Sequence, residues 1–352
     1  MRRFLFILAF AACATTGAEG EGDKNLPSSG VGPFRKLDIE EVKGIAPFVL
    51  DDDKAQYREP AALQEGEETL LFAVGTKDGR DVIFRTHAFD GRTFFGTAGH
   101  FGKKPPSVLE PDAAPSWENG ALSGPALLRA PSGELLLYYA AGGGIGVAHS
   151  SDGFTFKKDA ANPILKREAS WETTEVRAPS VVVMPSGRFR MFYSAGNAIG
   201  EAESDDGIHF RRLGDRPVLE PAPPPEPGSL LPNEKPPFDT ASVSDPFVSP
   251  RTTPAGRLQV RVLYTGRDAA GVSTIGLAGR FGEDGPLERQ PVPVYAINQK
   301  EVAPAFVERP EGSYLYVEQE RRDGQRIYRA IAGAFAPGNV KLGVPGDFPE
   351  SP

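Results

Sequence analysis

The stretch that decides the fold runs from Trp171 to Pro221 and reads WETTEVRAPSVVVMPSGRFRMFYSAGNAIGEAESDDGIHFRRLGDRPVLEP. Short runs of β-branched and aromatic residues alternate in it with Gly, Pro, Asn and Asp, which is the pattern of strands joined by tight turns. The pattern predicts strands at 181–183, 189–193, 199–202 and 209–211. Asp206-Gly207 fits a two-residue hairpin turn. The stretch therefore predicts a unit of four antiparallel strands.

A second copy of this unit comes directly before it, at 117–165, and reads WENGALSGPALLRAPSGELLLYYAAGGGIGVAHSSDGFTFKKDAANPIL. Both copies begin with Trp-Glu and share a Pro-Ser-Gly turn and an Asp-Gly turn. A third unit and two weaker ones follow the same plan around an anchor proline, and the five anchors are Pro60, Pro125, Pro179, Pro246 and Pro304. Four-stranded repeats at such spacings indicate propeller blades, because one blade cannot bury both faces of its sheet. We expect an all-β, five-bladed β-propeller; a β-sandwich of similar strand count gives no reason for the repeat.

The chain divides into four expected parts. Residues 1–20 have two arginines, an apolar run and then small residues, as a signal peptide does, and Cys13 at the end of the run resembles the lipidated cysteine of a bacterial lipoprotein. Ordinary cleavage after a small residue is the alternative. Residues 21–43 are a predicted linker, 44–340 the propeller and 341–352 a tail. We expect an exported protein, at the cell surface or outer membrane if it is lipidated, and otherwise periplasmic or extracellular.

Within the propeller, blade one is expected to have strands at 69–74, 81–87 and 92–95, and 47–50 is a candidate strand to close the ring. The proline-rich residues 222–237 are expected to form a loop over one face of the ring.

Composition and motif content narrow the classes of partner and of catalytic site that the protein is expected to have. Forty glycines and 34 prolines suit a turn-rich β protein, and the net charge of -8 argues against a nucleic-acid partner. The four histidines do not have metal-ligand spacing, so no metal and no cofactor are expected. The sequence contains no recognisable P-loop or Ser-His-Asp arrangement. Membrane contact is expected only through a lipid on Cys13, and the protein is expected to be a monomer.

The candidate site comes from the anchors. The first strand of a propeller blade lies innermost, so residues beside the anchor prolines are expected at one mouth of the central channel. The residues just before the prolines are Glu59, Gly124, Ala178, Asp245 and Ala303. Glu175 and Glu301 lie slightly further upstream, and Arg58, Arg177 and Tyr57 are candidate substrate-binding residues. Acids from several blades therefore point to a site assembled across the repeats.

Simpler interpretations stay open. Glu59 with Arg58, and Glu175 with Arg177, are also explained as local ion pairs, and Asp245 as a turn cap. Trp117 and Trp171 occupy equivalent repeat positions, which favours packing between blades over stacking on a sugar.

The motifs W-E-x-x-x-V-x-x-P-S-V, F-Y-S-A-G and I-G-x-A-x-S-x-D-G-x-x-F resemble those of five-bladed propeller glycoside hydrolases. That group includes families 43 and 32 and the mannoside phosphorylases. The resemblance implies a carbohydrate partner, with Glu59 at the general-base position of family 43, Asp245 as a second acid, and Glu175 or Glu301 as general acid. An inverting reaction is expected if the protein is like family 43.

The chain departs from those families, since Glu59 replaces an aspartate and the Trp-Met-Asn-Asp-Pro run of the fructosidases is missing. Two function classes remain: a glycoside-cleaving enzyme, and a non-catalytic propeller at the cell surface that binds a glycan or a protein.

Overall fold

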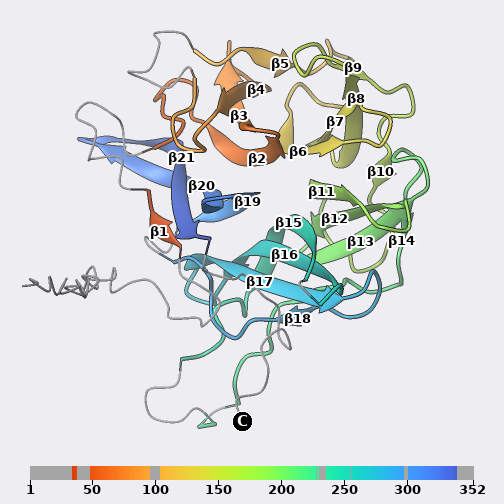
Figure 1. Cartoon of the computed structure of the whole chain (residues 1–352), viewed down its shortest axis with the longest axis vertical. Helices are drawn as coiled ribbons and strands as arrows, with labels where there is room; N and C mark the ends of the chain where they lie inside the picture. The colour runs from red at the N-terminus through yellow and green to blue at the C-terminus, as the bar shows by residue number, and fades with distance from the viewer. Residues whose placement is uncertain are drawn as a thin grey trace, which may run out of the picture.

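The computed structural model describes residues 34–37, 48–95, 104–226, 228–229, 235–253, 255–296 and 300–338. In these ranges every regular element is a strand, and the strands form five antiparallel sheets arranged in a ring (Figure 1). The chain is therefore a five-bladed β-propeller, as the repeat predicts. The predicted signal segment, Cys13 and the tail at 341–352 lie outside the described residues. Within the described part, no helix has the length and apolar character needed to span a membrane.

Each blade begins with an inner strand, and neighbouring inner strands contact one another around the ring. These five strands are β2 (Arg58–Glu65), β6 (Ser123–Arg129), β11 (Arg177–Val183), β15 (Ser242–Thr252) and β19 (Val302–Arg309). Two longer strands follow in each blade: β3 (Glu68–Lys77) and β4 (Arg80–Ala88), β7 (Leu135–Ala141) and β8 (Gly144–Ser150), β12 (Phe189–Ala195) and β13 (Ala198–Ser204), β16 (Leu258–Arg267) and β17 (Ser273–Phe281), β20 (Gly312–Asp323) and β21 (Arg326–Pro337).

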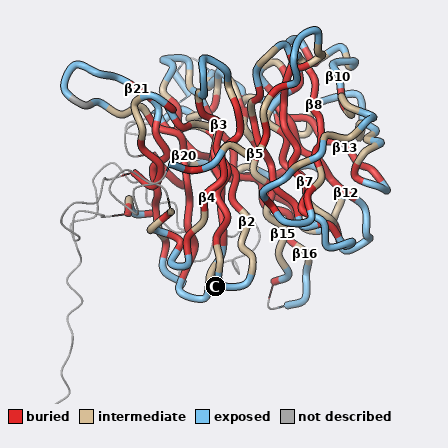
Figure 2. The backbone as a smooth tube through the Cα atoms, turned by 90° about the horizontal axis from the view of Figure 1, so that it is seen from above, coloured by how far each residue is buried: buried red, intermediate tan, exposed pale blue. Residues whose placement is uncertain are grey.

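The outer strands are short, and they are β5 (Ser107–Leu109), β9 (Lys157–Lys158), β10 (Leu165–Lys166), β14 (Arg211–Arg212), β18 (Glu288–Arg289) and β1 (Arg35–Lys36). Figure 2 shows buried residues along the strands and exposed ones at the turns, with the turn beside β21 standing out from the body.

The predicted inner and central strands are confirmed, but two predictions about outer strands are wrong. Residues 92–95 form no strand, because Asp90 Oδ1 accepts hydrogen bonds from the N–H groups of Arg92 and Thr93 and holds them in a turn; the outer strand is β5. Asp206 does not form a two-residue hairpin. Its Oδ1 accepts from the N–H groups of Ile208 and His209 at 2.8 Å, and this wider turn delays β14 to Arg211.

Strand β1 closes the ring as the outer strand of the fifth blade. It pairs antiparallel with β21, and the buried Phe34 and Leu37 on either side of it fix its position. From the predicted closing segment 47–50, Leu50 adds a bridge to Ile331, and Val49 N–H donates to the Ile331 carbonyl at 2.8 Å. Strand β1 falls inside the stretch predicted as a linker, because a two-residue strand leaves too little pattern to recognise.

The tryptophans are packing residues. Trp171 stacks on Tyr193 with centroids 6.0 Å apart, and Trp117 lies 5.9 Å from Tyr139 in the equivalent place. Gly200 is required there, because a Cβ at this position would lie 2.5 Å from the Tyr193 ring and 2.7 Å from Trp171. The tyrosine hydroxyls donate to buried carboxylates that follow the aromatic residue, namely Glu118, Glu172 and, in blade four, Asp239. The Trp-Glu motif is thus part of the blade framework.

The described residues of the 222–237 stretch border two grooves, one with Arg289 of β18 in blade four and one with Trp171 and Asn197 of blade three. None of the described ones lines the central channel, so this part of the expected loop does not cover it.

Candidate active site

Five equivalent backbone positions lie at one mouth of the channel. The residues just before the anchor prolines all have φ between 47° and 52°, and each lies at a bulge between the inner strand and the next strand. This left-handed conformation is strained for a residue with a side chain, and such strain is found mainly at functional sites. A bulge also changes the direction in which a side chain points. The equivalence of Glu59, Gly124, Ala178, Asp245 and Ala303 follows from these observations.

The backbone N–H groups of Glu59, Gly124, Asp245 and Ala303 each donate to a side chain of the preceding blade. Asp245 N–H donates to Ser194 Oγ at 2.8 Å, and Ala303 N–H donates to Thr265 Oγ1 at 2.9 Å. Glu59 N–H donates to Glu318 Oε2 at 3.2 Å. Gly124 N–H is capped differently, by Glu59 Oε2 at 2.6 Å. The side chain of Glu59 therefore links blades one and two at the mouth.

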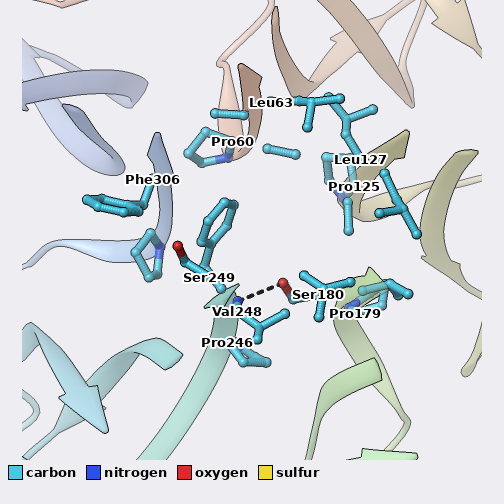
Figure 3. Close-up of a pocket in the computed structure, with 18 of the residues that line it drawn as sticks. Pro60, Leu63, Pro125, Leu127, Pro179, Ser180, Pro246, Val248, Ser249 and Phe306 are labelled. Atoms are coloured by element: carbon cyan, nitrogen blue, oxygen red, sulfur yellow. Dashed lines mark hydrogen bonds between the residues drawn. The ribbon is translucent and has the colours of Figure 1, made fainter. Parts of the chain in front are cut away.

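Below the mouth, the inner strands surround a cavity of about 270 Å³. Its walls are mostly apolar, and Glu59 and Asp245 are the carboxylates at its anchor end. Figure 3 shows the labelled wall residues around this cavity, among them Pro60, Pro125, Pro179, Pro246, Leu63, Leu127 and Phe306. Ser180 Oγ is used internally, since it accepts a hydrogen bond from Val248 N–H at 2.9 Å. The polar side chains of the lining lie toward its two ends: Glu59 and Asp245 at the anchor end, and Gln64, Ser249 and Glu308 toward the other, where Arg261 binds both Ser249 and Glu308.

Glu59 and Asp245 interact at this mouth. Burial raises the pKa of Glu59 and the negative charge of Asp245 raises it further, against the opposing effects of the Gly124 N–H and of two arginines. Asp245 Oδ1 accepts from Arg177 Nη1 at 2.7 Å, and Ser244 Oγ donates to Asp245 Oδ2 at 2.8 Å. The charge of Asp245 in turn raises the pKa of Arg177. One carboxyl that resists ionisation thus lies beside one that is paired with a guanidinium.

Glu318 is a third acid here, which the sequence did not indicate. It lies on β20, its side chain is 8% exposed, and its Oε1 is 3.0 Å from Arg329 Nη1. Burial, followed by the charge of Glu59, raises its pKa to about 7. The signal that identifies it is its register: Glu318 pairs with Val302 as Ser194 pairs with Arg177 and Thr265 with Ser244.

No family model matches the sequence, and no curated protein is significantly similar to it. Solved structures do match along nearly their whole length. A glycosyl hydrolase from Bacteroides ovatus has 15% identity and a TM-score of 0.62, with 89% of this chain and 96% of that one covered. A structure described as a mannoside phosphorylase-family (GH130) glycoside hydrolase that targets β-1,2 mannosidic linkages has 13% identity and a TM-score of 0.62, with 91% and 98% covered.

A thermostable family 43 glycoside hydrolase has 14% identity and a TM-score of 0.54, with 84% of this chain and 97% of that one covered. The chain has the five-bladed propeller fold of these glycoside hydrolases. The fold that the resemblance implies is therefore confirmed. At such identities it is the fold that is shared, and the chemistry has to be argued from the mouth of this propeller.

The remaining predicted site residues are not all brought to the mouth. Glu175 is exposed just before β11. Its side chain lies against Gly143, which is in the turn between β7 and β8 of the preceding blade. Glu301 is fully buried, and its Oε1 accepts from Gln319 Nε2 at 3.2 Å, so it belongs to the interior of blade five. Arg58 pairs with Asp81 at 2.5 Å. Tyr57 is 2% exposed and packs edge-on against Phe84, which leaves no aromatic face for a sugar.

Among the described residues, no group of three or more His, Cys, Asp and Glu side chains is arranged to hold a metal ion. At the mouth, the charges of Arg58 and Arg177 lower the pKa of Glu59, and that of Arg329 lowers the pKa of Glu318, each against the effect of burial.

Proposed function

We propose that the protein cleaves glycosidic bonds at this mouth, with Glu59 and Asp245 as the two acting carboxyl groups. Glycoside hydrolysis needs one protonated carboxyl to protonate the leaving oxygen and one carboxylate to activate water. The observation that carries the proposal is the unequal environment of the two acids, which come from blades one and four onto one cavity. Glu59, whose pKa is raised, acts as the acid, and Asp245, paired with Arg177, acts as the base.

This assignment reverses the role that the family 43 resemblance gives to Glu59. An inverting course and a substrate from the oligo- or polysaccharides remain part of the proposal, on the strength of the same resemblance. Export, with or without a lipid on Cys13, is supported by the Arg-Arg pair and apolar run at the N-terminus.

The test is a screen of chromogenic glycosides and oligosaccharides with the purified protein, followed by Glu59→Gln and Asp245→Asn. Each substitution is expected to lower kcat at least 100-fold, because it removes one of the two proton transfers. Glu134→Gln makes the same carboxyl-to-amide change in the turn between β6 and β7, and full activity is expected for it. Product anomers followed by NMR during turnover report the stereochemical course.

The Asp245–Arg177 ion pair favours a second candidate, a propeller that binds a glycan without cleaving it. An arginine bound to the intended base leaves fewer lone pairs for water. Calorimetric binding of an oligosaccharide with no turnover over days, and loss of that binding in Arg177→Gln, would support this candidate against hydrolysis.

A further inference from the structure

Blade five extends above the mouth further than its repeat equivalents do. Beyond the register at which Glu318 pairs with Val302, strand β20 continues for five residues to Asp323, and β21 returns from Arg326. The corresponding strands of the other four blades end one to three residues beyond the same register. Five residues of strand are about 16 Å long, and Figure 2 shows the turn of this hairpin standing out from the body. Four blades pack without such an extension, so the fold does not account for residues 319–330, here called the overhang.

A pocket of about 480 Å³ lies where the overhang meets the segments that close the ring. Its lining has four cationic side chains and one carboxylate, which are Lys36, Lys300, Arg321, Arg322 and Glu320. The protein as a whole has a net charge of -8, so the charge of this pocket is opposite in sign to that of the chain. Like charges gathered around one space repel one another unless an anion lies among them.

The carboxylates of the protein balance only part of this charge. Glu320 Oε1 lies 3.2 Å from Lys300 Nζ and 3.4 Å from Arg322 Nη2, so one carboxylate serves two cations. Arg321 pairs with Asp51. The pairs of Lys300 and Arg322 are more than half exposed and therefore weak, so a bound carboxylate can compete with Glu320 for both cations.

Lys36 is the cation of the pocket that has no carboxylate partner among the described residues. Its Nζ lies 5.4 Å from the centroid of the Phe48 ring, and the guanidinium carbon of Arg321 lies 5.2 Å from the same centroid. The aromatic ring thus gathers two cations beside the pocket. An anion in the pocket would complete this arrangement.

The pocket also contains an acceptor in need of a donor. Gln319 is 1% exposed and lines the pocket, and its Nε2 donates to Glu301 Oε1 at 3.2 Å, whereas its own Oε1 has no hydrogen-bond partner. A buried acceptor without a donor is unfavourable, so a ligand hydroxyl that donates to it is favoured. Sulfate carries the negative charge but has no proton to donate. A sugar acid has a carboxylate for the cations and hydroxyl groups for Gln319.

We propose that this pocket binds a uronic-acid unit, with its carboxylate held by Lys36 and Arg322 and one of its hydroxyls donating to Gln319 Oε1. Gln319 directly follows Glu318, whose carboxylate accepts from Glu59 N–H, so the pocket lies beside the mouth on the same face of the ring. A chain of sugars that crosses the mouth can therefore extend into it. The substrate assignment rests on the proposed function, and it makes that substrate an acidic polysaccharide.

The first measurement is calorimetric binding of four tetrasaccharides, made of galacturonate, glucuronate, mannuronate or guluronate. It uses the wild type and, so that no ligand is consumed, Glu59→Gln. The methyl ester of each tetrasaccharide is the control ligand, because it keeps the sugar rings and removes the charge. At least one tetrasaccharide is expected to bind about 10-fold or more tightly than its ester, and this preference is expected to shrink as salt is added.

The second measurement locates the binding. Lys36→Gln and Arg322→Gln are each expected to weaken the charged tetrasaccharide about 5-fold or more and to leave its ester unaffected. Lys157→Gln is the matched control, since it removes an exposed lysine from β9, an outer strand as short as β1. Gln319→Leu is expected to weaken the tetrasaccharide but not sulfate, which separates the hydroxyl contact from the charge. The melting temperature of each variant shows that it is folded.

The pocket is refuted as a uronate site if no tetrasaccharide binds better than its ester, or if binding survives Lys36→Gln and Arg322→Gln combined. Sulfate binding that depends on Lys36, without uronate binding, would show a simple anion pocket and overturn the inference as well. Cleavage of neutral glycosides without uronate binding would refute the pocket and leave the proposed function standing. Uronate binding through Lys36 without any cleavage would refute the proposed function and leave the pocket standing.

Discussion

Replacing Glu318 with threonine is expected to change how the stability of the propeller depends on pH. The pKa of Glu318 is about 7 in the folded protein, whereas an unfolded glutamate ionises near its ordinary value of 4.5. Because the folded pKa is raised, the contribution of this group to stability is fully present below about pH 4.5 and is lost as the pH rises through 7. Two and a half pH units correspond to roughly 3 kcal/mol of unfolding free energy.

The threonine variant has no carboxyl at this position and does not lose this free energy of unfolding as the pH rises. Its unfolding free energy minus that of the wild type is therefore expected to rise by about 3 kcal/mol between pH 4 and pH 8. Urea unfolding, followed by tryptophan fluorescence at half-unit pH steps, measures this difference, and the slopes must agree between the two proteins. The hydrogen bond from Lys300 lowers the pKa of the partly exposed Glu320, two residues away on the same strand, so the control Glu320→Gln should give no such rise. A difference that stays constant across the whole range would show that Glu318 ionises normally, and the electrostatic account of the mouth would be wrong.

Three further outcomes follow from the contacts. Glu201, buried between Arg190 and Arg280 at 2.7 and 3.0 Å, joins blades three and four, so Glu201→Gln should cost about 3–5 kcal/mol in urea unfolding. A cost below 1 kcal/mol would contradict this. Leu37→Ala should loosen the ring closure and cost about 2–4 kcal/mol, with faster hydrogen exchange in β21, since this side chain is buried in a core cluster with Val49 and Ile331. Glu301→Ala should destabilise by about 1–3 kcal/mol, whereas the exposed Glu175→Gln should leave the melting temperature unchanged.

Most of the fold can be predicted from the sequence because the blades repeat the same local pattern of strand and turn residues. Apolar strands separated by Gly, Pro and Asp turns recur around a proline, and the aromatic-plus-carboxylate pair recurs before it. What the pattern does not contain is pairing between distant segments. The two residues of β1 have no recognisable periodicity, and their place beside β21 depends on the burial of Phe34 and Leu37 in cores built by other parts of the chain.

The site divides in the same way. Glu59 and Asp245 are found from sequence because each stands next to an anchor proline, where the repeat fixes position to within a residue. Glu301 is also near an anchor, since it lies two residues before Ala303. At that point the side chain is directed into the interior of the blade, and it is fully buried. Glu318 lies in the middle of a strand, with no Gly, Pro or other turn residue beside it. Only its pairing register with Val302 shows that it reaches the mouth.

The repeated backbone of the five anchors bears on where the proposed substrate binds. All five anchor positions share one backbone conformation, so the blades differ at the mouth chiefly in their side chains. The acids come from blades four, five and one, which are neighbours in the ring, and the anchors of blades two and three are Gly124 and Ala178. A side chain at Gly124 would lie 2.8 Å from the Ala178 backbone, so these two anchors are closely packed and leave no space between them for a side chain. If the protein cleaves glycosides as proposed, a sugar is expected to lie over blades two and three, beside Arg177, and to present its glycosidic bond to the acids of the other blades.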